Sequence, residues 1–192
     1  MSPSEHPDRF EEAVRTILAE IGEDPDRQGL AVTPERVRRM FEQMTEGYRT
    51  DPDGILEGAQ FDVDYDEMVV VRDIELYSLC EHHLVPFYGH AHVGYLPRGK
   101  VIGLSKIPRV VDLFAHRLQV QERMTQQIAD FLMERLEPKG VGVVLRTTHL
   151  CTAMRGVRRP GATMVTSAML GTFRRDAKTR AEFLAFIGSG RD

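Results

Sequence analysis

The stretch that decides the fold is EMVVVRDIELY, residues 67–77, followed by GHAHVGYLP, residues 89–97. Apolar and polar residues alternate along both segments, and a period of two is typical of strands that bury one face. A shorter strand is expected at KVIGL (100–104), and two more at VGVVLRTTHLCT (141–152) and TMVTSAMLGTF (163–173). The sheet is therefore expected to begin near residue 67.

Segments of helical periodicity surround these strands. Residues 8–22 and the segment after Thr33 carry apolar side chains at helical spacing, and we expect Thr33 to cap the second helix and Gly47 to end it. Residues 49–66 look like a linker. Three more helices are expected: after Ser105, which can cap the first, over residues 121–136, and over residues 176–187. This order predicts an α+β fold with a mainly antiparallel sheet.

Composition limits the class of protein. The 192 residues are 42% hydrophobic and 28% charged, which suits a globular protein, and the net charge of −4 argues against general nucleic-acid binding. No apolar run approaches the roughly 20 residues of a membrane span, and the first residues are too acidic for a signal peptide. We therefore expect a cytoplasmic protein without nucleic-acid or membrane partners. Cys80 and Cys151 are the only cysteines, which excludes a disulfide framework.

A short apolar segment, LCEHHLVPF, carries three side chains that can bind metals: Cys80, His82 and His83. The C-x-x-H spacing lets Cys80 and His83 converge on one ion. His149 and Cys151 are two apart on an expected strand, so both are expected to face the same way. Zinc favours thiolate and imidazole, and three protein ligands leave a fourth position for an activated water. Buried thiols and hydrogen-bonded core histidines explain the same residues equally well.

Other polar residues have an ordinary explanation when the sequence is taken alone. Gln121 and Glu122 lie between apolar residues of an expected helix, where a solvated face is the default interpretation. The remaining candidates are scattered basic residues, each of which is explained as a surface residue: Arg36, Arg39, Lys106, Arg109 and Arg155.

Several segments occurring in order, CEHHLVPF, GYLP, VIGLSKIPRVVDLFA, LQVQERMTQQI, THLCTAMRG and TSAMLGTF, closely resemble GTP cyclohydrolase I. The resemblance begins near Ile21 and reaches the final helix. It implies the tunnelling fold (T-fold), an antiparallel sheet with paired helices on one face, over residues 61–192, after an N-terminal helical region over residues 1–60. It also implies a homo-oligomer, typically a decamer of two stacked pentamers.

The resemblance further implies a reaction, in which GTP is converted to 7,8-dihydroneopterin triphosphate and C8 of the purine leaves as formate, the first step of pterin or folate synthesis. In that reaction Cys80, His83 and Cys151 hold Zn²⁺. His82 matches the general acid that protonates N7, a role that histidine often takes in enzymes. His149 matches a histidine near the ribose that serves the later proton transfers.

The same resemblance assigns the substrate contacts. Glu122 accepts hydrogen bonds from N1–H and the 2-amino group of guanine, neither of which adenine offers, and Gln121 lines the same pocket. Ser105 lies near the ribose. The triphosphate is expected to contact Lys106, Arg109 and Arg155, together with Arg36 and Arg39 from a neighbouring subunit. The active site would therefore be shared between chains.

Two other functions remain open from the sequence. One is another T-fold enzyme, a reductase of a deazaguanine nitrile that uses a nucleophilic cysteine, although the HLC motif argues against it. The other is a noncatalytic guanine-nucleotide-binding regulatory module with a structural zinc held by four protein ligands.

Overall fold

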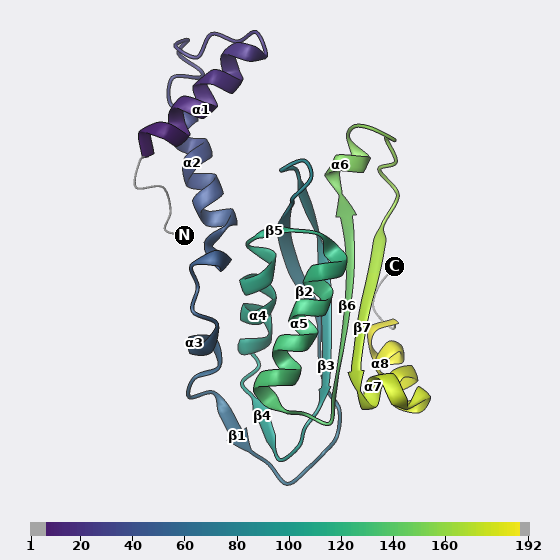
Figure 1. The fold of residues 1–192 in the computed structure, drawn as a ribbon. Helices are drawn as coiled ribbons and strands as arrows, with labels where there is room; N and C mark the ends of the chain where they lie inside the picture. The colour runs from purple at the N-terminus through teal and green to yellow at the C-terminus, as the bar shows by residue number, and fades with distance from the viewer. Residues whose placement is uncertain (1–6, 189–192) are drawn as a thin grey trace.

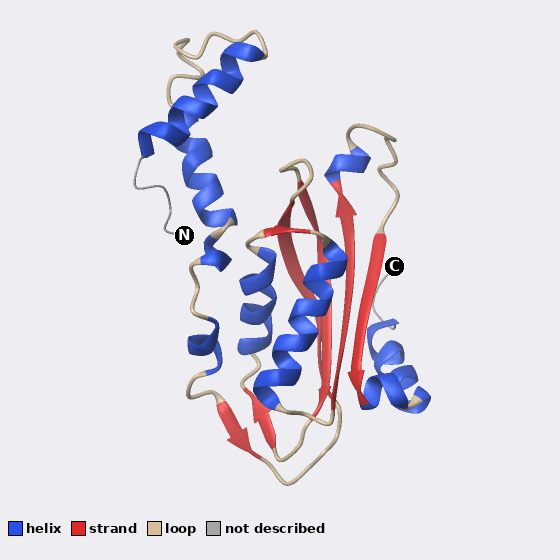
Figure 2. Cartoon of the chain, in the orientation of Figure 1, coloured by secondary structure: helices blue, strands red, loops and turns tan. Residues whose placement is uncertain are grey.

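The computed structural model describes residues 7–188, which form an α+β fold built on a five-stranded sheet (Figures 1 and 2). The strand order is β5-β2-β3-β6-β7, and every neighbouring pair is antiparallel except the short parallel pair β2–β5. A separate two-stranded sheet pairs β1 with β4. The strands are β1 (Gln60–Asp62), β2 (Val69–Cys80), β3 (Pro86–Leu96), β4 (Lys100–Ile102), β5 (Leu118–Gln119), β6 (Gly140–His149) and β7 (Met164–Gly171).

Two helices, α4 (Lys106–Ala115) and α5 (Gln121–Leu136), lie side by side over one face of the sheet (Figure 1). The main core forms between them and the strands because alternate strand residues, such as Val93 and Leu145, point toward the helices and are fully buried. Each such aliphatic side chain contributes about 1.5–3 kcal/mol when it leaves water. The expectation of a mainly antiparallel α+β fold is confirmed.

A second, smaller core lies on the opposite face, where α7 (Thr172–Arg175) and α8 (Ala177–Gly188) cover one end of the sheet. Phe173 and Phe183 are fully buried there, with ring centroids 5.4 Å apart at 78°. Gly94 and Gly142 face each other across β3 and β6. A Cβ at Gly142 would lie 2.6 Å from the ring of Phe173, so the packing of the two rings requires a residue without a side chain at this position.

The N-terminal helices α1 (Pro7–Glu20) and α2 (Thr33–Met44) pack on each other and extend away from the sheet (Figure 1). Arg38 of α2 donates to Glu11 of α1 and to Glu42 of its own helix. Below them the 3-10 helix η1 (Glu46–Tyr48) and the helix α3 (Pro52–Leu56) lead to the sheet. Within residues 7–188, no helix is both long enough and apolar enough to cross a membrane.

Three local expectations were wrong. Thr33 is the first residue of α2 and Val32 occupies the cap position, while α2 ends at Met44, before Gly47. Gly47 belongs to η1, where its backbone lies so close to α4 that a Cβ would fall 2.3 Å from the Leu113 carbonyl oxygen. The expected linker contains α3 and β1 instead. Asp51 caps α3 by accepting from two backbone N–H groups, and β1 pairs with β4.

We predict that Gly142→Ala lowers the free energy of unfolding by about 1–3 kcal/mol, because the added methyl overpacks the rings of Phe173 and Phe183. Denaturant unfolding followed by circular dichroism measures the change. Gly161→Ala is the matched control, because its Cβ would meet nothing within 4 Å. Equal stability of the two variants would contradict the packing explanation.

Candidate metal centre and active site

The hairpin turn between β2 and β3 presents the first part of the site. Cys80 is the last residue of β2 and is buried, while His82 and His83 are exposed in the turn. The backbone N–H of Cys80 donates to Val85 O at 3.0 Å, and that of Leu84 donates to Cys80 O at 2.8 Å. Leu84 has φ 54°, so the turn closes through a left-handed residue that is not glycine. These bonds curl the turn so that both histidines point back toward Cys80.

The second part of the site comes from the end of β6. His149 pairs with Phe87 of β3, and β3 begins only one residue earlier, at Pro86. Because β3 extends only one residue beyond this pair, β6 has no further partner there. The chain then enters the short helix α6 (Leu150–Ala153), which contains the buried Cys151. The expected strand over 141–152 therefore ends at His149, and the expectation that His149 and Cys151 share a strand face was wrong. Cys151 reaches the site from a helical turn.

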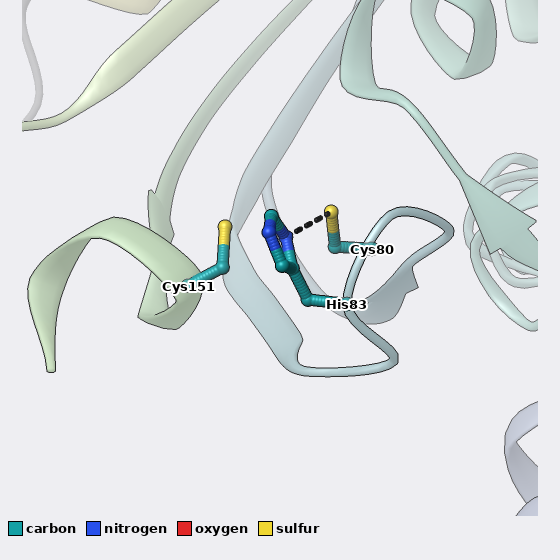
Figure 3. A group of neighbouring side chains, drawn as sticks. All are labelled: Cys80, His83 and Cys151. Atoms are coloured by element: carbon teal, nitrogen blue, oxygen red, sulfur yellow. Dashed lines mark hydrogen bonds between the residues drawn. The ribbon is translucent and has the colours of Figure 1, made fainter. Parts of the chain in front are cut away.

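Cys80, His83 and Cys151 nevertheless converge, and Figure 3 shows their side chains turned toward one another. Their ligand atoms all lie within 4.8 Å of one another, and Cys80 Sγ is 4.0 Å from His83 Nδ1. Two ligands of one tetrahedral zinc ion lie about 3.5–3.8 Å apart, given bond lengths near 2.0–2.3 Å. A small inward movement of the three side chains would therefore complete a metal site.

The chemistry of the donor set fits a metal ion. Burial, and then the neighbouring Cys80, raise the pKa of the Cys151 thiol, while the positive charge of Arg155 opposes the shift. Two thiols this close carry their negative charge together only when a cation offsets it. His82 Nδ1 lies 3.8 Å from Cys80 Sγ, yet within the described residues the group that could hold a metal comprises three members, without His82 or His149.

The start of α5 brings two further candidates to the same end of the sheet. Gln121 is fully buried and its Oε1 lies 2.9 Å from His149 Nε2. Glu122, the next residue, is exposed. Burial lowers the pKa of His149, and the negative charge of Glu122 opposes that shift. The structure thus brings the three possible metal ligands to one end of the sheet. The other residues there are His82, His149, Gln121, Glu122 and Arg155.

The other expected substrate residues lie elsewhere in the chain. Ser105 occupies the cap position of α4, as expected, but its side chain makes no capping hydrogen bond. Together with Leu104 and Pro108 it lines a hollow against residues 71–75 of β2, at least five residues before Cys80. Lys106 and Arg109 follow on α4, and Arg36 and Arg39 lie exposed on α2. The single chain does not bring these residues to the metal group.

Sequence reasoning missed the contacts that tie the site together. Arg123 of α5 donates to Glu81, in the turn, and to Gln119 Oε1 and Leu118 O of β5, just before the helix. The ring of Phe87 stacks on His149 with centroids 4.5 Å apart and an angle of 7°. Arg123 and Glu81 each adjoin a motif residue, but no pattern in the sequence indicates that they pair.

These features define an α+β protein with a Cys-His-Cys group suited to a metal and a histidine held beside it. The family model described as GTP cyclohydrolase I matches residues 10–188. The chain belongs to the GTP cyclohydrolase I family.

Two relatives named GTP cyclohydrolase 1 agree with this assignment. GTP cyclohydrolase 1 of Thermobifida fusca (strain YX) is 59% identical, over 93% of this chain and 87% of that protein. GTP cyclohydrolase 1 of Leptospira biflexa serovar Patoc (strain Patoc 1 / Ames) is 54% identical, over 94% of this chain and 99% of that protein. A solved structure, the archaeosine synthase QueF-Like in the apo form, aligns with 56% of this chain and 97% of that one, at 18% identity and a TM-score of 0.46.

We predict that Cys151→Ala reduces the metal retained after dialysis to less than about a tenth of the wild-type content, because two ligands remain of the three. Elemental analysis by inductively coupled plasma mass spectrometry measures the content per chain. His90→Ala, which removes an exposed histidine of β3, is the control and should retain the wild-type amount. Full metal content in Cys151→Ala would show that the ion binds elsewhere.

Proposed function

We propose that this protein opens the imidazole ring of GTP at C8 by hydrolysis, releases formate, and forms 7,8-dihydroneopterin triphosphate. The observation that carries the proposal is the convergence of Cys80, His83 and Cys151 beside two histidines that are not members of the metal group, in a chain that matches the family over residues 10–188. Three protein ligands leave a coordination position open, which is typical of catalytic rather than structural zinc sites.

Zinc is the ion that the donor set favours, since two thiolates and one imidazole match its preferences. Bound there, it would supply Lewis-acid activation of the water that attacks C8. Cys80, His83 and Cys151 would hold the ion, and the hydrogen bonds of the hairpin turn restrain the backbone that carries two of these ligands.

Two histidines move protons in this proposal. His82 stands beside Cys80 in the exposed turn, where it can protonate N7 of the purine and make C8 easier to attack. His149 is held between Phe87 and Gln121, and it serves the later proton transfers near the ribose. The exposure of His82 suits a group that must meet an incoming substrate, while the restraint on His149 suits a group that must act at a defined atom.

Glu122 recognises the base. Its carboxylate, at the exposed start of α5, accepts hydrogen bonds from N1–H and the 2-amino group of guanine. A base that lacks these donors would leave the carboxylate without partners, which costs several kcal/mol in a closed site. Arg155, near Cys151, provides positive charge for the triphosphate from the same chain.

The remaining substrate contacts come from other chains of a ring-shaped homo-oligomer. The start of α4 lies away from the metal group, so its polar residues serve the site of an adjacent subunit; these are the cap residue Ser105, Lys106 and Arg109. The extended helix α2 also serves an adjacent subunit, through Arg36 and Arg39. We infer a decamer of two stacked pentamers with shared active sites. Each chain contributes a T-fold domain over residues 61–192 and an N-terminal helical region over residues 1–60.

The test is the release of formate and 7,8-dihydroneopterin triphosphate from GTP by the purified protein of known metal content. Both products should form, fall by at least about a hundredfold after chelation, and return when zinc is added, because no side chain replaces the activated water. Chromatography of the pterin and an enzymatic formate assay measure the two products. GTP that binds to the zinc-loaded protein and stays unchanged would instead identify a noncatalytic binding module.

We predict that Glu122→Gln lowers kcat/KM for GTP by a factor on the order of a hundred to a thousand, because an amide presents one acceptor where the base needs two. Steady-state formation of the pterin measures the effect. Glu134→Gln, on the exposed side of the same helix, is the control and should behave as wild type. A Glu122→Gln enzyme of normal efficiency would remove this carboxylate from base recognition.

A further inference from the structure

The side chain of Gln121 is fully buried and reaches from α5 to the two neighbouring strands β6 and β7. Its Nε2 donates to two backbone carbonyl oxygens, Leu145 O at 3.2 Å and Met164 O at 3.1 Å, and lies 3.0 Å from Thr166 Oγ1. Its Oε1 accepts from Thr147 Oγ1 at 2.5 Å. Every hydrogen-bonding atom of this amide is therefore engaged inside the protein.

These contacts allow only one orientation of the amide. Backbone carbonyl oxygens only accept hydrogen bonds, so the end of the side chain that faces Leu145 O and Met164 O must be the NH₂ group. The reversed orientation would place Oε1 against two other acceptors. The opposite end, 2.9 Å from His149 Nε2, is therefore the oxygen.

The hydroxyl groups nearby agree with that orientation. Thr125 Oγ1 donates to the backbone oxygen of Gln121 at 2.7 Å, so its hydrogen is already used. Thr166 Oγ1, which is 2.7 Å from Thr125 Oγ1, must then donate to it. The hydrogen of Thr166 therefore points away from the Gln121 NH₂ group, whose two hydrogens are shared among three acceptor oxygens: Leu145 O, Met164 O and Thr166 Oγ1.

The consequence falls on His149. An amide oxygen cannot donate, so the bond between it and His149 Nε2 forms only when Nε2 carries a hydrogen. In the neutral ring the single remaining lone pair then belongs to Nδ1. The ring of Phe87 stacks on the imidazole of His149, with centroids 4.5 Å apart and an angle of 7°, and this contact restrains the plane of the imidazole. The hydrogen bond to the Gln121 amide restrains the rotation of the imidazole within that plane.

We propose that Gln121 is a positioning residue that holds His149 with its hydrogen on Nε2, so that Nδ1 is the ring atom that exchanges protons with the substrate. This inference rests on the proposed function for the identity of the reaction, but the tautomer is a property of the protein alone. It gives Gln121 a role distinct from a direct contact with the base.

The first measurement is made without substrate, on the metal-loaded protein. Solid-state ¹⁵N spectra of histidine-labelled protein, with the His149 signals assigned by loss in His149→Ala, report which ring nitrogen carries the hydrogen. The wild-type protein should show hydrogen on Nε2, and Gln121→Met should show a mixture of both tautomers. Hydrogen on Nδ1 in the wild type, or an unchanged tautomer in Gln121→Met, would overturn the proposal.

The second measurement is kinetic. Gln121→Met should lower kcat for GTP about 10–100-fold while KM changes less than about threefold, as expected for a residue that acts through another. The same substitution should have no further effect in a His149→Ala background. An additive loss, or a rise in KM with kcat unchanged, would instead indicate a general structural role or a substrate contact.

Two variants guard against simple misfolding. Thr166→Val removes a hydroxyl from the same buried cluster but leaves the bond between Gln121 and His149, so it should retain the Nε2–H tautomer and most of kcat, unlike Gln121→Met. Gln126→Met, an exposed residue one turn along α5 that donates to Asp130, controls for the substitution itself and should match the wild type. A wild-type protein that shows the tautomer but converts no GTP would refute the proposed function and leave the positioning role standing.

Discussion

The register of β3 between β2 and β6 is the constraint on which the site depends. β3 pairs with β6 from Phe87↔His149 to Leu96↔Gly140, and with β2 up to Leu79↔Pro86. The end of β2, the hairpin turn and the end of β6 therefore meet at one end of the sheet. A slip of one residue would turn Phe87 from the core to the opposite face and move His149 away from Gln121.

Polar side chains at this end of the sheet are buried without being left unpaired. Burying an amide that lacks partners costs several kcal/mol, so a fully buried Gln121 is tolerated only because β6, β7 and His149 satisfy each of its atoms. Across the described residues, every buried side-chain nitrogen and oxygen has a partner. A satisfied network of this kind is rigid, which suits a group that must present one atom to a reaction.

Arg123 links the two halves of the site outside this network. It joins Glu81 of the hairpin turn to the residues just before α5, and the backbone N–H of Glu81 donates to Gln119 O at 3.1 Å. The turn that carries two possible metal ligands is thereby tied to the helix that carries Glu122. The C-terminal end of α4 joins the same contacts, because Gln119 Nε2 donates to Phe114 O at 2.9 Å and Gln119 Oε1 accepts from Arg123.

Period-two alternation over residues 67–77 and 89–97 was enough to predict the central strands, and helical spacing predicted α1, α2, α4, α5 and α8, because these patterns follow from which face of each element is buried. Residue types and spacing left five candidate metal ligands, and the resemblance to the family selected Cys80, His83 and Cys151, which the structure brings together. Tertiary structure alone decided that Cys151 arrives from a helical turn, that Arg123 pairs with Glu81, and that Gln121 bonds His149. Such contacts join residues up to 42 positions apart in the chain, and they depend on strand register and side-chain packing that no local pattern encodes.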